Sequence, residues 1–137
     1  MTKEEVAPPA PRGRPLVGRP LAWAALTLVL TLTPADDMPV VPPWELISFD
    51  TAAHAFVFAV LAALAVFSAR RQSSSEWLRR HAYLLLLISC IGFGLLIEAL
   101  QTAMHLGRHG EWSDAISDAL GTGVGLLLAY ATRRWWE

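Results

Sequence analysis

Four apolar runs dominate this sequence and constrain its fold more than any other feature. They occupy about residues 17–34, 51–69, 82–104 and 115–132. A helix needs roughly 20 apolar residues to cross the ~30 Å hydrocarbon layer of a membrane. The last three runs approach or exceed that length, and the first can cross if its ends thin the bilayer locally. We therefore predict an all-α membrane protein, an antiparallel bundle of four transmembrane helices. The composition agrees, since 54% of the residues are hydrophobic and only 17% are charged.

The N-terminal segment has a different character. Five of its first 20 residues are proline, and they alternate with charged side chains. Such a segment cannot bury a core or hold a long helix. We predict a disordered cytoplasmic tail over residues 1–20 and a transmembrane domain over residues 21–134. The alternative is a signal peptide cleaved near Thr33-Pro34-Ala35, because a basic region and a short apolar stretch precede that site. The other three helices keep the same orientation under either interpretation.

The basic residues are segregated along the chain, and this predicts how the bundle is oriented. Ten of the eleven Lys and Arg residues lie in the tail, in the connection between the second and third runs, or after the fourth run. Lys and Arg resist translocation, so these segments should be cytoplasmic. We expect a multi-pass protein of the cell membrane with its N- and C-termini in the cytoplasm. The acidic residues of the other two connections then face outward.

Polar side chains within the apolar runs mark the candidate site. A charged group inside a membrane span costs several kcal/mol unless it is paired or hydrated, so its presence asks for a reason. In each of the last three runs, polar residues recur at helical spacing near the end that should lie outside. An alternating topology brings those ends to one level, which predicts a shared polar pocket. The candidate ligand-binding residues are Asp50, His54, Glu98, Gln101, Arg108, Asp114 and Asp118.

Small residues on the fourth run predict its packed face. Gly121-x-x-x-Gly125 lets another helix backbone approach closely, and Ser117 extends the pattern by one turn. Asp118 lies on the same stripe, so we expect it to point into the bundle and meet His54 or Glu98. The sequence leaves open whether this face packs within one chain or between copies in a homo-oligomer.

Several of these residues also have a purely structural interpretation. A pair between His54 and Asp118 or Glu98 would fix helix register without binding anything. Asp114 or Ser113 would serve as the N-cap of the fourth helix. Arg108 is either a solvated loop charge or an anchor for a phosphate or carboxylate head group.

Composition and spacing also bear on cofactors and partners. A metal site built from His54, Glu98 and an aspartate is chemically feasible, but no recognised ligand spacing supports it, so we expect no metal and no cofactor. The lone Cys90 excludes an internal disulfide and a cysteine zinc site. The chain has no long basic face apart from the basic residues that flank the membrane spans, so we expect no nucleic-acid partner.

Taken in order, these polar residues resemble the VanZ-like family of small bacterial membrane proteins. The resemblance covers roughly residues 21–130 and rests on Asp50-x-x-x-His54, Glu98-x-x-Gln101, Arg108, Asp114, position 118 and Gly121-x-x-x-Gly125. It implies a place in the cell envelope and a link with susceptibility to teicoplanin-type antibiotics. The chain departs from the family at Thr51, where members often have Lys, and at Asp118, where they often have Asn. Both departures make the predicted pocket more acidic.

Two functions are compatible with these residues. We favour a non-catalytic protein that binds an envelope lipid or a glycopeptide ligand at the outer leaflet, with membrane lipids as its surroundings. The alternative is an enzyme that modifies a lipid-linked envelope precursor, with Glu98 or Asp114 as base, His54 as proton carrier and Arg108 as head-group anchor. A transporter or proton path is a third possibility. Because the inner half of the spans holds no acid, a continuous path would need an oligomer.

Overall fold

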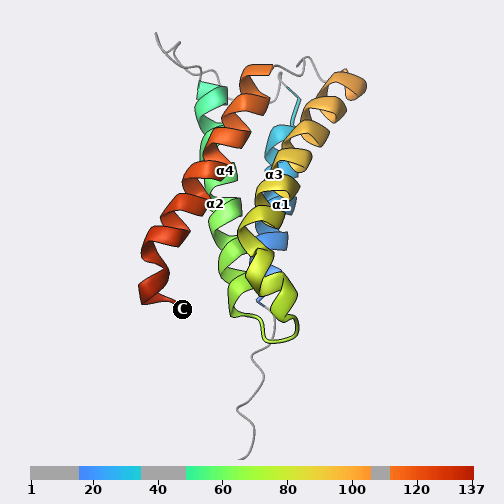
Figure 1. Cartoon of the computed structure of the whole chain (residues 1–137). Coiled ribbons are helices and arrows are strands. Elements are labelled where there is room, and N and C mark those ends of the chain that lie inside the picture. Colours follow the sequence, from blue (N-terminus) through green and yellow to red (C-terminus); the bar gives the residue numbers. More distant parts are fainter. Residues whose placement is uncertain (1–15, 35–48, 106–111) are drawn as a thin grey trace, which may run out of the picture.

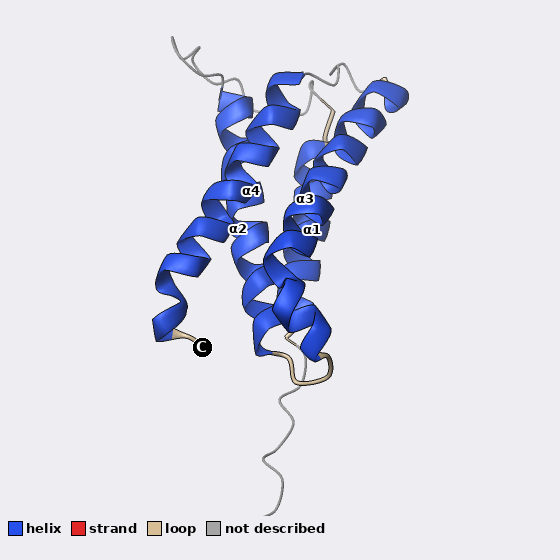
Figure 2. Ribbon diagram, in the orientation of Figure 1, coloured by secondary structure: helices blue, strands red, loops and turns tan. Residues whose placement is uncertain are grey.

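The described part of the protein is a bundle of four α-helices. The computed structural model describes residues 16–34, 49–105 and 112–137. The helices are α1 (Gly18–Thr31), α2 (Phe49–Arg71), α3 (Glu76–Met104) and α4 (Trp112–Thr132), and a short turn, η2 (Arg133–Trp135), follows α4. The described residues form no strand (Figures 1 and 2). The predicted all-α fold is confirmed.

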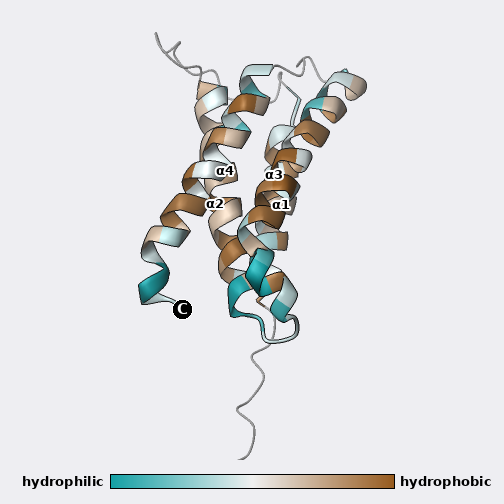
Figure 3. Cartoon of the chain, viewed as in Figure 1, coloured by the Kyte–Doolittle hydropathy of each residue, from teal (hydrophilic) through white to brown (hydrophobic). Residues whose placement is uncertain are grey.

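Three of the helices are long and apolar enough to cross a membrane. They are α2 with 23 residues, α3 with 29, and the continuous segment Trp112–Trp135 with 24. Figure 3 shows hydrophobic residues along the middle of these helices and hydrophilic residues gathered at the end that holds the α2–α3 turn and the C-terminus. Many large apolar side chains point outward, among them Leu84, Ile88, Leu120 and Leu127. An apolar outer surface around a helical bundle is the surface that lipid covers, and the chain is a membrane protein.

Two helix boundaries differ from the apolar runs. The first helix has 14 residues, about 21 Å at the rise of an α-helix, and so is shorter than the hydrocarbon layer. It begins at Gly18, within the segment assigned to the tail, whose residues 1–15 lie outside the described part of the chain. The third helix begins at Glu76, six residues before the apolar run, because the Ser75 side chain caps it by accepting a 3.2 Å hydrogen bond from Leu78 N.

Glycines allow α4 to pack directly on the backbone of α2. A Cβ atom added at Gly121 would overlap the carbonyl oxygen of Ala55, and one at Gly125 would overlap that of Ala59. At Gly123, on another face of the same helix, an added Cβ would meet nothing within 4 Å. The two glycines therefore set the close approach of α4 to α2, which lie side by side in Figure 1.

The first helix is attached to the bundle by two polar contacts. Trp23 Nε1 donates a 2.9 Å hydrogen bond to Val57 O of α2. At the other end of α1, Gln101 Nε2 of α3 donates a 2.8 Å hydrogen bond to Thr31 O. Carbonyls in the last turn of a helix have no intrahelical partner, so Gln101 satisfies one of them.

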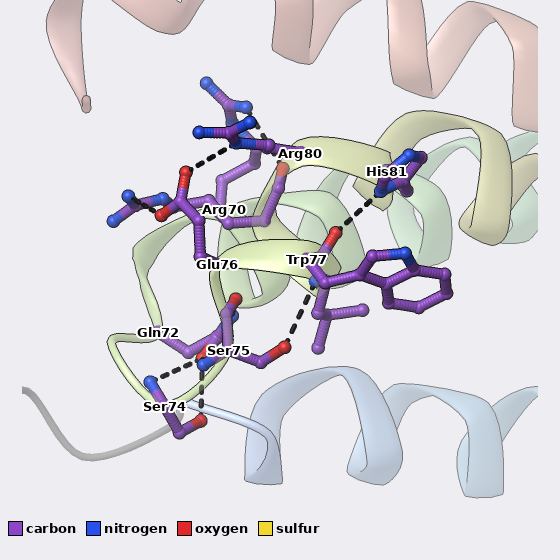
Figure 4. A network of polar contacts seen from close by, with 10 residues as sticks. Arg70, Gln72, Ser74, Ser75, Glu76, Trp77, Arg80 and His81 are labelled. Atoms are coloured by element: carbon purple, nitrogen blue, oxygen red, sulfur yellow. Dashed lines mark hydrogen bonds and ion pairs between the residues drawn. The ribbon is translucent and has the colours of Figure 1, made fainter.

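The α2–α3 turn and the C-terminus form a charged end of the molecule. Within the turn, Gln72 Oε1 accepts hydrogen bonds from the backbone N–H groups of Ser74 and Ser75, and Glu76 pairs with Arg79 and Arg80 (Figure 4). Arg70 Nε donates a 2.7 Å hydrogen bond to Glu137 Oε1, which joins α2 to the C-terminal residue. This contact with the Arg70 guanidinium holds the pKa of the Glu137 carboxyl below its ordinary value.

Candidate functional site

A buried His–Asp pair lies between α2 and α4, at the opposite end of the bundle from the charged turn. His54 Nδ1 is 3.0 Å from Asp118 Oδ1, and the two side chains are only 2% and 1% exposed. Ala55 follows His54 by one position, and Gly121 follows Asp118 by three. The close contact between the backbones of Ala55 and Gly121 keeps α2 and α4 together at this level. An ionised carboxylate can only accept, so beside an ionised Asp118 His54 Nδ1 donates, and in a neutral imidazole Nε2 is then an acceptor.

A second layer of hydrogen bonds joins the same helices closer to their N-termini. Thr51 Oγ1 donates to Asp114 Oδ1 at 3.1 Å, and Ser117 Oγ donates to the backbone carbonyl of Thr51 at 2.5 Å. Asp114 and Ser117 are both buried, and Asp50 is half-buried beside them. The carboxylates of Asp50 and Asp114 and a ring nitrogen of His54 lie within 4.8 Å of one another.

Glu98 brings α3 into the same cluster. One of its carboxylate oxygens, a ring nitrogen of His54 and a carboxylate oxygen of Asp118 all lie within 4.8 Å of one another. Gly94, one turn earlier on α3, makes room for this arrangement, because a Cβ atom there would lie 2.7 Å from Asp118 Oδ2. The acids of α3 and α4 therefore meet around one histidine of α2.

Glu98 also lines a groove between α3 and α4. The groove has a volume of about 430 Å³. Its other walls are mostly apolar, with Leu95 and Ala99 on α3 and Ala115 on α4, and Trp112 is also part of its lining. Glu98 thus belongs both to the buried cluster and to a groove that opens between two membrane-spanning helices. This combination of one acid with apolar walls suits an amphiphilic ligand.

The structure separates one predicted site residue, Gln101, from the cluster. Gln101 shares a helix with Glu98, but it is 1% exposed and its amide reaches α1, where it holds Thr31 O. Arg108 lies outside the described residues. The cluster therefore contains five of the seven candidates, namely Asp50, His54, Glu98, Asp114 and Asp118.

Two residues that shape the site, Thr51 and Gly94, are not among the predicted site residues. Thr51 was noted only as a departure from the family, yet it contacts both Asp114 and Ser117. Gly94 was passed over inside an apolar run. Its spacing of four residues from Glu98 places both on one helix face, and this was the signal that could have identified it.

The fold and the cluster together define a class of protein. It is an all-α membrane protein in which a cluster of acids around one histidine is drawn from three helices long enough to cross a membrane and lies at one end of the bundle. Within that class, the chain belongs to the VanZ/LLP1 family, whose sequence model matches residues 19–133. The resemblance stated from the polar motifs is thereby confirmed. No curated protein and no solved structure gives a significant match to the chain.

Proposed function

We propose that the protein resides in the cell membrane with both termini in the cytoplasm and its polar cluster near the outer leaflet. The support is the distribution of charge on the folded chain. The α2–α3 turn, the end of α4 and the C-terminus lie at one end of the bundle (Figure 1). Six arginines belong to this end, Arg70, Arg71, Arg79, Arg80, Arg133 and Arg134. Basic residues favour the cytoplasmic side, so the opposite end, with His54 and Asp118, faces outward.

The same proposal assigns the cluster a binding role. The protein binds an amphiphilic envelope ligand, either an envelope lipid or a teicoplanin-type lipoglycopeptide, and thereby alters susceptibility to that antibiotic. The observation that supports this binding role is the position of Glu98, which both lines the apolar groove and belongs to the buried cluster with His54 and Asp118. An acyl chain fits along the groove between α3 and α4. Hydroxyl or amine groups of a polar head would donate to the Glu98 carboxylate.

The test is a charge-neutralising substitution with a matched control. Glu98→Gln keeps the size of the side chain and removes the negative charge that the head group needs. We expect cells expressing this variant to lose the change in teicoplanin susceptibility that the wild-type protein confers. Purified Glu98→Gln protein in nanodiscs should bind labelled teicoplanin at least about tenfold more weakly, the loss of one charge-assisted hydrogen bond.

Glu76→Gln is the control, because it makes the same chemical change at the exposed opposite end of α3. It should retain both the susceptibility change and the binding. Equal behaviour of the two variants, or unaltered susceptibility with Glu98→Gln, would exclude the assigned role of the groove.

A specific feature of the cluster also favours a second function, an enzyme acting on a lipid-linked envelope precursor. Asp118 holds His54 through Nδ1, and His54 Nε2 is buried without a hydrogen-bond partner among the described residues. A carboxylate that orients a histidine, with the other ring nitrogen available to a substrate proton, is the arrangement of a general base. In this function the precursor would enter along the groove and present a hydroxyl or amine to His54.

Turnover distinguishes the enzyme from the binding protein. Purified protein in lipid, incubated with polyprenyl-diphosphate-linked precursors, should convert them to a product of different mass. His54→Gln should abolish this conversion because the amide has no basic nitrogen. His81→Gln, on the exposed surface near the charged turn, should convert the precursors at the wild-type rate. Intact precursor after incubation with wild-type protein would leave binding as the function.

A further inference from the structure

The buried cluster brings together metal-ligand side chains whose spacing in the sequence matches no recognised metal motif. His54, Glu98 and Asp118 come from three different helices, and one ligand-type atom from each lies within 4.8 Å of the other two. We propose that these three residues bind a divalent transition-metal ion, with Zn²⁺ best matched to one imidazole nitrogen and two carboxylate oxygens. The proposal stands on the geometry of these residues and does not require the ligand or the reaction proposed above.

The Asp118 carboxylate is the second observation that points to a cation. Its Oδ1 contacts His54, whereas its Oδ2 is buried and has no hydrogen-bond partner among the described residues. Oδ2 faces α3 at Gly94, one turn before Glu98. A buried acceptor left without a partner is unfavourable, because it has lost its hydrogen bonds to water and gained none in the protein. An ion held between Asp118 and Glu98 would satisfy this oxygen. The Asp118 side chain is 1% exposed and lies between α2, where it contacts His54, and α3, where it faces Gly94.

The spacing of the histidine and the aspartate agrees with shared coordination. Two ligand atoms on a tetrahedral Zn²⁺, each at about 2.0–2.1 Å from the ion, are roughly 3.3 Å apart. His54 Nδ1 and Asp118 Oδ1 are 3.0 Å apart. The two side chains are therefore already close enough to share one zinc ion once the proton between them is released to solvent, and the Asp118 carboxylate can bind that ion through Oδ1 and Oδ2 together.

Charge balance in the membrane gives a further reason for a divalent ion. Two ionised carboxylates beside a neutral imidazole are costly in a low-dielectric interior, since their mutual repulsion is poorly screened. A divalent cation neutralises both charges at once. It also leaves a fourth coordination position, as catalytic zinc sites do. The groove that Glu98 lines lies beside the site and gives water or an oxygen ligand access to that position.

An overlapping set of residues, Asp50, His54 and Asp114, competes for the same histidine. We assign the ion to Glu98 and Asp118 for two reasons. Asp114 Oδ1 already accepts a hydrogen bond from Thr51. Asp118 carries the buried oxygen without a partner among the described residues, so it gains most from a cation. Asp50 and Asp114 would then form a negative outer layer that favours the metal-bound state.

The primary experiment measures zinc binding by the full-length protein. Protein in nanodiscs is stripped with a chelator and titrated with Zn²⁺ alone against a competing chromophoric chelator, with bound metal measured by elemental mass spectrometry. We expect stoichiometric binding of one ion per chain, and Mg²⁺ in excess should not displace it. With Co²⁺ in place of zinc, visible d–d absorption should report nitrogen and oxygen ligation. Failure of the stripped wild-type protein to bind Zn²⁺ would overturn the proposal.

Two glycine substitutions test the position of Asp118 without removing a ligand. Gly94→Ala puts a Cβ atom 2.7 Å from Asp118 Oδ2, so the carboxylate must move. Gly92→Ala, two residues earlier on α3, meets nothing within 4 Å. We expect Gly94→Ala to weaken Zn²⁺ binding by at least about tenfold, the effect of misplacing a metal-site group, and Gly92→Ala to bind as the wild type does. Equal zinc affinity in both variants would count against Asp118 as a ligand.

Ligand substitutions complete the design. Asp118→Asn and Glu98→Gln keep side-chain size and should each reduce zinc affinity and alter the Co²⁺ spectrum, whereas Glu76→Gln should do neither. Loss of zinc on Asp50→Asn with full binding by Asp118→Asn would place the ion in the competing set and overturn the assignment. If wild-type protein binds no zinc while Glu98→Gln still removes the teicoplanin effect, the metal proposal fails and the proposed ligand-binding function stands.

Discussion

At the residue scale, burial decides which polar side chains matter. His54 and Asp118 pair through Nδ1 and Oδ1, and their side chains are almost completely buried. From the sequence, either Asp118 or Glu98 could be the partner of His54. Helical spacing identifies the face on which a residue lies but not the residue opposite. Gln101 illustrates the same limit. It shares a stripe with Glu98, yet its amide contacts Thr31 O because α1, whose position the stripe does not encode, lies against α3 there.

The His54–Asp118 pair predicts a specific loss of stability. In metal-free protein, His54→Ala should lower the free energy of unfolding by about 3–5 kcal/mol, because Asp118 is left buried without its partner. The double variant His54→Ala/Asp118→Ala should lose less than the sum of the single variants. Denaturation of the purified protein in detergent, followed by circular dichroism, measures both. His81→Ala, at an exposed histidine, should stay within about 0.5 kcal/mol of the wild type, and a similar loss there would show that the pair contributes nothing particular.

At the element scale, close contact between α2 and α4 organises the bundle. The small residues of α4 let its backbone reach α2. Two hydrogen bonds join the same helices, one from Ser117 Oγ to Thr51 O and one from Thr51 Oγ1 to Asp114. The sequence indicated that the Gly121 and Gly125 face is packed but left open whether the partner helix belongs to the same chain. In the folded protein it is α2 that lies against this face. The close approach also explains why His54 and Asp118 reach hydrogen-bonding distance.

The glycine contact predicts a contrast within one helix. Gly121→Ala and Gly125→Ala should each destabilise the protein by about 1–3 kcal/mol, because the new methyl group forces α4 away from α2. Gly123→Ala adds the same methyl group to open space and should leave stability unchanged or slightly raised, since alanine favours the helix. Thermal unfolding in the same detergent compares the three variants. Equal effects at 121 and 123 would mean that packing against α2 is not the cause.

At the scale of the whole molecule, the alternating direction of the helices places basic residues at one end and the acidic cluster at the other. The arginines belong to the α2–α3 turn and the C-terminal segment, which lie at one end of the bundle (Figure 1), whereas the start of α2, the end of α3 and the start of α4 hold the clustered acids and His54. This separation suits a protein that meets the cytoplasm at one end and an envelope ligand at the other.

The proposed orientation predicts opposite labelling of two exposed tryptophan positions. Trp112 is 80% exposed at the start of α4, and Trp77 is 62% exposed beside the α2–α3 turn. In a Cys90→Ala background, Trp112→Cys should react with a membrane-impermeant maleimide on intact cells, whereas Trp77→Cys should react only after permeabilisation. Mass spectrometry of the labelled protein measures both. Labelling of both positions on intact cells, or the reverse pattern, would contradict the outward placement of the cluster.

The sequence by itself determined the fold class, three spans long enough to cross a membrane and the residues that carry polar chemistry. These depend on run length, composition and helical periodicity, all of which are local properties of the chain. The tertiary structure alone decided that Asp118 pairs with His54, that Gly94 makes room for the Asp118 carboxylate, and that Gln101 contacts α1 while Glu98 joins the cluster. Such contacts depend on the rotation and separation of packed helices, and residues distant in the chain carry no local mark of their partners.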